Sequence, residues 1–101
     1  MSEPQAGATV TVTGPVTIEE SPRWQEALLG ALQAGPVVTI DLAGSGPWDV
    51  AGVQLLLSAL ESARRSGRVV QLVHVPEVCL RVAGQAGVRV VLEPAIAGPP
   101  S

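Results

Sequence analysis

Apolar residues along this chain recur at two spacings, every second residue in some segments and every third or fourth in others. The first spacing is typical of strands and the second of helices. Residues 8–13 alternate as a strand, with the valines on one face. Gly14-Pro15 indicates a turn, and residues 16–18 are expected to form a second short strand. The chain is therefore predicted to begin with a hairpin.

Three helices are predicted by stripes of apolar residues. The first starts at Ser21-Pro22, where the serine hydroxyl can cap free backbone amides, and it ends at Gly35-Pro36. The second spans residues 50–66, and Gly67 favours a stop there. A short third helix is expected over residues 76–85.

Apolar runs between these helices predict the remaining strands. Residues 37–42 form a nearly continuous apolar run, which is typical of a buried central strand. Residues 68–75 and 88–92 supply the last two strands. The predicted order is β-β-α-β-α-β-α-β, an α/β domain. Strands that alternate with helices pair in parallel across right-handed crossovers.

Composition limits the class of protein. With 101 residues, 47% of them apolar and 15% charged, the chain suits one globular domain. The net charge is −3 and the six Lys+Arg are scattered, which argues against nucleic-acid binding. No run approaches the roughly 18 apolar residues of a membrane span, so direct membrane insertion is not expected.

The ends of the chain and its one cysteine bear on location. The domain is expected over residues 8–92, between a flexible N-terminus, 1–7, and a flexible tail, 93–101, that contains three prolines. The N-terminus lacks a signal-peptide pattern. The single Cys79 cannot form an internal disulfide, which fits a reducing compartment. We therefore expect a cytoplasmic protein.

No catalytic, metal or cofactor site can be assembled from the sequence. His74 has no second histidine and no paired cysteine at metal-ligand spacing. Cys79 has no activating base nearby in sequence. The segment 44–46 is Gly-Ser-Gly, but neither Gly-Lys-Ser/Thr nor G-x-G-x-x-G follows a strand here. We expect no enzyme activity and predict no cofactor and no metal.

The segment 37–60, VVTIDLAGSGPWDVAGVQLLLSAL, resembles the signature segment of the STAS domain family. As in that family, an apolar strand ends in Asp41, a Gly/Pro-rich loop follows, and Asp-x-x-Gly opens a leucine-rich helix. Residues 68–76, RVVQLVHVP, and 78–88, VCLRVAGQAGV, are similar to later family segments. The resemblance covers roughly residues 10–92 and implies a STAS fold, a mixed sheet with helices packed mainly on one face.

Departures from the family motif bear on function. In the phosphoregulated antagonists of the family the motif reads roughly D-S-S-G-L, and the serine just before the glycine accepts phosphate. Here Val50 and Ala51 replace the two hydroxyl residues, so this switch is missing. Asp-x-Ala-Gly looks closer to the STAS subunit of bacterial phospholipid-transport ABC complexes and to other STAS proteins that work without phosphorylation.

The resemblance therefore implies a non-enzymatic protein-protein interaction module with two possible partners. One is a serine-kinase-type anti-sigma factor, with this chain as an antagonist-like regulator. The other is the ATPase of an ABC-type phospholipid transporter, with this chain as an accessory subunit. The sequence leaves both open.

The partner surface is expected around the start of the second helix. Asp49 is predicted to cap that helix. Gly52 allows either a close backbone approach by a partner or tight internal packing. Trp48 is either partly buried or an interface anchor, and Ser45 is either a turn residue or a displaced phosphosite. The predicted partner-binding residues are Ser45, Trp48, Asp49, Val50, Ala51, Gly52, Gln54 and Ser58.

Overall fold

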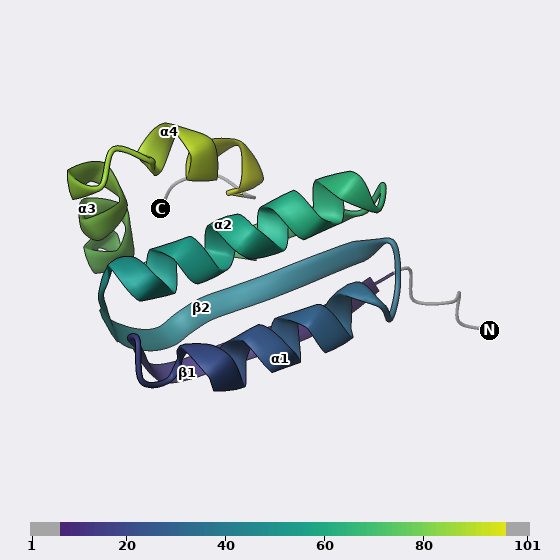
Figure 1. Cartoon of the computed structure of the whole chain (residues 1–101), viewed down its shortest axis with the longest axis horizontal. Coiled ribbons are helices and arrows are strands. Elements are labelled where there is room, and N and C mark those ends of the chain that lie inside the picture. Colours follow the sequence, from purple (N-terminus) through teal and green to yellow (C-terminus); the bar gives the residue numbers. More distant parts are fainter. Residues whose placement is uncertain (1–6, 97–101) are drawn as a thin grey trace.

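Three strands and their connecting helices make up the structure, a computed structural model that describes residues 7–96 (Figure 1). The α/β class and the alternation of strand and helix predicted for the middle of the chain are confirmed. In chain order the elements are β1 (Gly7–Val16), α1 (Ser21–Leu32), β2 (Val37–Trp48), α2 (Val50–Arg65), β3 (Val69–Val73), α3 (Glu77–Gln85), α4 (Arg89–Leu92) and the 3-10 turn η1 (Glu93–Ala95).

The sheet has the order β1-β2-β3, so β2 lies in the centre. Figure 1 shows α1 and α2 side by side on one face of it. Side chains alternate along β2: Val38, Ile40 and Leu42 are buried beneath the helices, whereas Thr39 and Asp41 are half-buried on the opposite face. The helix layer therefore lies mainly on one side of the sheet, as the family resemblance implied.

The predicted N-terminal hairpin is wrong, because β1 runs straight through Gly14-Pro15. Gly14 has a φ of +79°, and the register with β2 shifts on either side of it. At both shifts β2 has one residue more than β1, so Gly14 lets β1 follow an irregular partner strand instead of reversing the chain. The Gly/Pro-rich loop predicted after Asp41, which includes residues 44–48, is likewise part of β2, paired with β1 as far as Val16↔Trp48.

The predicted last strand at 88–92 is also wrong. The segment forms the helix α4. Leu92 is buried, whereas the consecutive residues Val90 and Val91 are 70% and 53% exposed. In a strand with one buried face, burial would alternate from residue to residue. The described strands consequently pair only in parallel, and the sheet is not mixed. From the C-terminal segment, Ile96 makes a single parallel bridge to Leu72 of β3.

Of the predicted flexible ends, residues 1–6 and 97–101 lie outside the described residues. Gly7 belongs to β1, and residues 93–95 form η1.

The helices begin close to the residues at which the sequence predicted them to begin. The N-cap of α1 is Glu20 and not the predicted Ser21. The Glu20 carbonyl accepts a hydrogen bond from Trp24 N at 3.2 Å, and the Ser21 side chain caps no backbone amide. Pro22 lies in the first turn of α1 as predicted.

The core is aliphatic, with one tryptophan and one thiol among its buried side chains. Cys79 of α3 is fully buried within it. Burial disfavours the charged thiolate and raises the pKa of Cys79 from 9.0 to about 12. The thiol is therefore a packing group in the folded protein, without nucleophilic character.

This burial predicts a pH-dependent loss of stability. The folded pKa of Cys79 exceeds the unfolded value, so its contribution is complete below pH 9.0 and falls as the pH rises toward 12. The chain contains no Lys and no Tyr, so no other side chain titrates in that window. Urea unfolding across this range should show the wild type losing stability and Cys79→Ala, less stable at neutral pH, losing none. Parallel curves for the two proteins would contradict the assignment.

Candidate functional site

Asp49 stands between β2 and α2 and is the N-cap of α2. Its backbone is extended, with φ −132° and ψ −175°, and its Oδ1 accepts a hydrogen bond from Gly52 N at 3.1 Å. The predicted cap is therefore confirmed. Gly52 N also donates to the Asp49 carbonyl at 3.0 Å, so the side chain supplies a second acceptor in the first turn, where helix amides lack their usual partner four residues earlier.

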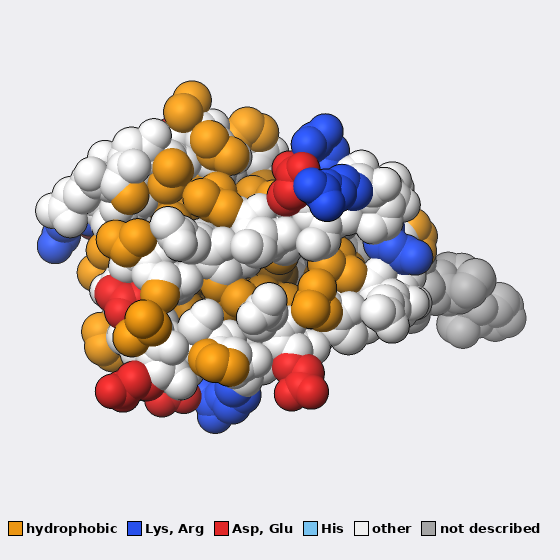
Figure 2. Space-filling view, viewed as in Figure 1, with side chains coloured by type: hydrophobic (Ala, Val, Ile, Leu, Met, Phe, Trp, Pro, Cys, Tyr) orange, Lys and Arg blue, Asp and Glu red, His pale blue; other side chains and the backbone are white. Residues whose placement is uncertain are grey.

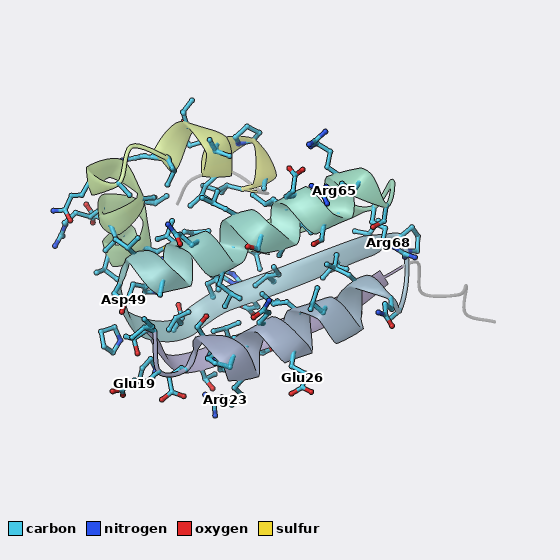
Figure 3. The ribbon with its side chains drawn as sticks, viewed as in Figure 1. Glu19, Arg23, Glu26, Asp49, Arg65 and Arg68 are labelled. Carbon is cyan, nitrogen blue, oxygen red and sulfur yellow. The ribbon has the colours of Figure 1, made fainter. Side chains whose placement is uncertain are left out.

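The second carboxylate oxygen of Asp49 binds a distant part of the chain. Oδ2 accepts from Ile18 N at 3.1 Å, and Asp49 N donates to Val16 O at 3.5 Å. Figure 3 shows Asp49 where α2 begins, at the same end of the molecule as the labelled Glu19. The carboxylate thus ties the start of α2 to the corner between β1 and α1.

Gly52 lies where α2 touches β1. A Cβ placed on it would lie 2.3 Å from Val16 O and 2.8 Å from Trp48 Cε3. Any side chain at this position would have to push the helix off the strand. Tight internal packing, one of the two roles expected for Gly52, therefore accounts for the glycine.

Trp48 is only 6% exposed, so its ring lies in the core beneath the start of α2. Its Nε1 donates to Ser45 Oγ at 3.0 Å, and Ser45 Oγ donates to Leu42 O at 2.7 Å. The Ser45 hydroxyl is half-buried and both donates and accepts. Ser45, Trp48 and Gly52 can therefore shape a partner surface from beneath, while other residues cover them.

The exposed part of the predicted site is a ridge along α2. Val50 is 46% exposed, Gln54 and Ser58 are exposed, and Ala51 is half-buried. Residues 50, 54 and 58 are four apart and therefore share one helix face. Their partner-binding role stays a prediction.

Sequence reasoning missed Ile18. Its side chain is 70% exposed and its amide is held by Asp49. Ile18 is 31 residues away in sequence and falls in a segment predicted as a strand, so no sequence signal links it to α2. We name the combined surface of Ile18, Val50, Ala51, Gln54 and Ser58 the α2 ridge.

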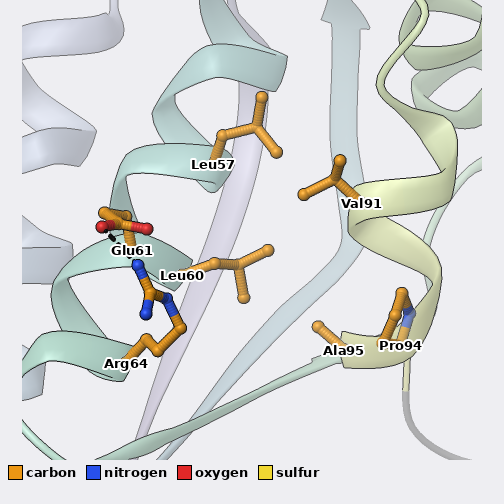
Figure 4. Close-up of a pocket in the computed structure, with 7 residues that line it drawn as sticks. All are labelled: Leu57, Leu60, Glu61, Arg64, Val91, Pro94 and Ala95. Atoms are coloured by element: carbon orange, nitrogen blue, oxygen red, sulfur yellow. Dashed lines mark hydrogen bonds and ion pairs between the residues drawn. The ribbon is translucent and has the colours of Figure 1, made fainter.

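A hollow lies on each side of the α2 ridge. Toward α1 it is small, about 40 Å³, and includes Leu29, Leu55 and Ser58 in its lining. Toward α4 and η1 it has about 520 Å³ and is lined by Leu57, Leu60, Glu61, Arg64, Val91, Pro94 and Ala95 (Figure 4). Figure 2 shows apolar side chains gathered over α4 and beside α2.

One charged pair borders the larger hollow. Arg64 donates to Glu61 Oε2 at 2.8 Å, and this bond lowers the pKa of Glu61.

Within residues 7–96 no three His, Cys, Asp or Glu side chains come together as a metal site would need. Among the described helices, none combines the length and apolarity required to cross a membrane. The surface presents apolar and uncharged polar groups on a rigid helix, which suits recognition of another surface.

The comparisons with known proteins agree with this geometry. A family model described as "Mlab, STAS domain" matches residues 1–93, nearly the whole chain. The chain belongs to the STAS domain family. A search of curated proteins by sequence finds no match.

Solved STAS structures share the fold at low sequence identity. A sulfate transporter family protein from Wolinella succinogenes is 18% identical with a TM-score of 0.75, over 95% of this chain and 80% of the other. The STAS domain of a SulP transporter from Vibrio cholerae is 15% identical with a TM-score of 0.63, over 93% and 71%. The anti-sigma factor antagonist SpoIIAA in its unphosphorylated form is 12% identical with a TM-score of 0.71, over 99% and 86%. The STAS fold predicted from sequence is confirmed.

The Gly52 contact predicts opposite effects for two glycine-to-alanine substitutions. Gly52→Ala should lower the free energy of unfolding by about 3 kcal/mol, because its methyl group meets backbone and indole atoms. Gly84→Ala, on α3, should raise it by about 0.5–1 kcal/mol, because a Cβ there meets nothing within 4 Å and alanine favours the helix. Chemical denaturation measures both. Equal effects would show that α2 does not press on β1.

Proposed function

We propose that this STAS domain is a non-enzymatic protein-binding module, an anti-sigma factor antagonist-like regulator that binds its partner without a phosphate switch. Its partner is a serine-kinase-type anti-sigma factor. The observation that carries the antagonist-like role is the likeness over the whole domain to the anti-sigma factor antagonist SpoIIAA, with a TM-score of 0.71 over 99% of this chain. The missing phosphate switch rests on Ala51, which lies in the first turn of α2 beside the Asp49 cap. It occupies the motif position where the phosphorylated antagonists have their serine, and it has no hydroxyl.

Phosphate at that position would add nearly two negative charges to the start of the helix. Without a hydroxyl at position 51, no phosphate can be added at the start of α2. Ser45 is a poor substitute, because its half-buried hydroxyl accepts from Trp48 and donates to Leu42. Modification would remove the hydroxyl proton and with it the bond to Leu42 O. Binding is therefore governed by the amount of each protein or by a competing partner.

The proposed contact surface is the α2 ridge. Ile18 and Val50 give it two exposed apolar side chains next to Asp49, and Gln54 and Ser58 add uncharged polar groups. Exposed apolar groups framed by polar ones are a common arrangement at protein interfaces. The Asp49 cap fixes these groups relative to one another, which reduces the entropy lost on binding.

A second candidate function is an accessory subunit that binds the ATPase of an ABC-type phospholipid transporter. The specific observation in its favour is the motif Asp49-Val50-Ala51-Gly52, which resembles the STAS subunit of such complexes. The match to the "Mlab, STAS domain" model is compatible with it. We place the protein in the cytoplasm under either function, where the unpaired Cys79 would stay reduced.

Capture of the tagged full chain from an extract of its own cells tests the proposal. The wild type should recover a serine-kinase-type anti-sigma factor, identified by mass spectrometry. Gln54→Arg/Ser58→Arg should reduce recovery at least tenfold, a loss of about 1.4 kcal/mol in binding. Gln71→Arg, at another exposed position, on β3 and away from the ridge, is the control and should bind as the wild type does.

Other outcomes decide between the candidates. Recovery of an ABC ATPase with its membrane subunits, lost in the same double variant, would replace the first function by the second. If the double variant recovers as much partner as the wild type, the contact surface lies elsewhere and not on the α2 ridge. Failure to recover either class would contradict the proposed function.

A further inference from the structure

The outer edge of β1 is unpaired in the described structure. β1 pairs with β2 on its inner side, and no described strand pairs with its outer side. It is ten residues long, twice the length of β3 at the opposite edge. The edge of β3 is also partly occupied by the bridge between Leu72 and Ile96.

Native proteins protect such edges with charged residues, prolines or bulges in the edge strand itself. From Gly7 to Thr13 the sequence GATVTVT contains no charge and no proline. The register shift after Thr11↔Asp41 leads to Thr13↔Gly44, so the extra residue is in β2 and β1 stays regular. Protection begins only beyond Thr13, at Gly14-Pro15. Seven regular, neutral residues thus present free backbone groups.

We propose that this edge binds the same edge of a second copy of the chain, so that two sheets join into one around a two-fold axis. Antiparallel pairing centred on Val10 uses all seven regular residues, from Gly7 to Thr13. It would form about six to eight backbone hydrogen bonds between the copies, depending on which alternate residues point outward. The dimer does not rest on the proposed function; only its description as bivalent does.

The strand is complementary to itself. Val12 is buried and Val10 half-buried on the helix face, whereas the threonines at 9, 11 and 13 are exposed on the open face. In this register Thr9 lies opposite Thr11 of the second copy, and Val10 lies opposite Val10. Pairs of β-branched residues favour cross-strand contact. Because the strand is neutral, two identical edges meet without repulsion, and this favours a second copy as the occupant.

The adjoining helix leaves room for the second copy. Trp24 Nε1 donates to Pro15 O at 3.3 Å, so the Trp24 side of α1 lies toward β1. Ala27 and Ala31 follow Trp24 by three and seven residues and share that side. A two-fold axis normal to the sheet places both α1 helices on the same face as neighbours. Their methyl side chains permit close approach.

Such a dimer would leave both α2 ridges uncovered. Val16, next to Asp49, is six residues beyond Val10, or about 20 Å along the strand. The Asp49 ends of the two ridges would therefore lie about 40 Å apart, toward opposite ends of the joined sheet. The dimer would present two identical binding surfaces, which makes it a bivalent module.

Sedimentation of the full chain over a concentration series tests the dimer. The wild type should show a reversible monomer–dimer equilibrium. Thr9→Lys/Thr11→Lys places like charges opposite each other twice and should weaken the dimer at least tenfold. Thr9→Lys/Thr11→Glu makes the same number of changes at the same positions but places opposite charges face to face, so its dimer should be at least as tight as that of the wild type.

Gln71→Lys, on the open face of β3, is the single-charge control and should dimerise as the wild type does. Circular dichroism confirms that each variant is folded, and the Lys/Glu variant keeps the test decisive if the Lys/Lys variant is not. A wild type that is monomeric up to about 1 mM, a very weak association, would overturn the proposal. Equal dimerisation by the two double variants would overturn it as well.

Discussion

The Asp49 carboxylate is the interaction on which this end of the domain depends. One oxygen accepts from Gly52 N and so starts α2, while the other accepts from Ile18 N and so fixes the chain between β1 and α1. A charged acceptor makes stronger hydrogen bonds than a neutral one. The two segments are far apart in sequence, and this single side chain gives them one common geometry.

Packing beneath the cap enforces the same geometry. Gly52 brings the first turn of α2 against the Val16 carbonyl, and Trp48 fills the space under that turn with its indole nitrogen bound to Ser45. The first turn of α2 cannot shift without opening a gap or a clash at the Val16 carbonyl, and Trp48 cannot shift without losing the hydrogen bond of its indole nitrogen. The residues above them, Val50 and Gln54, are held by this layer. A surface fixed before binding loses little entropy when a partner docks.

Sequence reasoning predicted those parts that depend on local chemistry. The spacing of apolar residues located α1, α2 and the first half of β2, and Asp49 was identified as a cap from its position before an apolar stripe. Errors arose where tertiary pairing overrode a local signal. Gly14-Pro15 reads as a turn, yet it lies within β1, paired with β2. Residues 88–92 read as a strand, yet they form α4 and bury Leu92 while Val90 and Val91 stay exposed. Ile18 joined the site only through a contact across 31 residues.

Backbone amide exchange in wild type and Asp49→Ala most directly tests the claim that one carboxylate joins the two segments. Alanine removes both side-chain oxygens, so Ile18 N loses its acceptor, whereas Gly52 N keeps the Asp49 carbonyl at 3.0 Å. The Ile18 amide should therefore exchange at least tenfold faster in the variant, with amides of the central strand unchanged as the internal reference. If the Ile18 amide keeps its wild-type protection, the carboxylate does not hold the corner to the helix, and this account of the site is wrong.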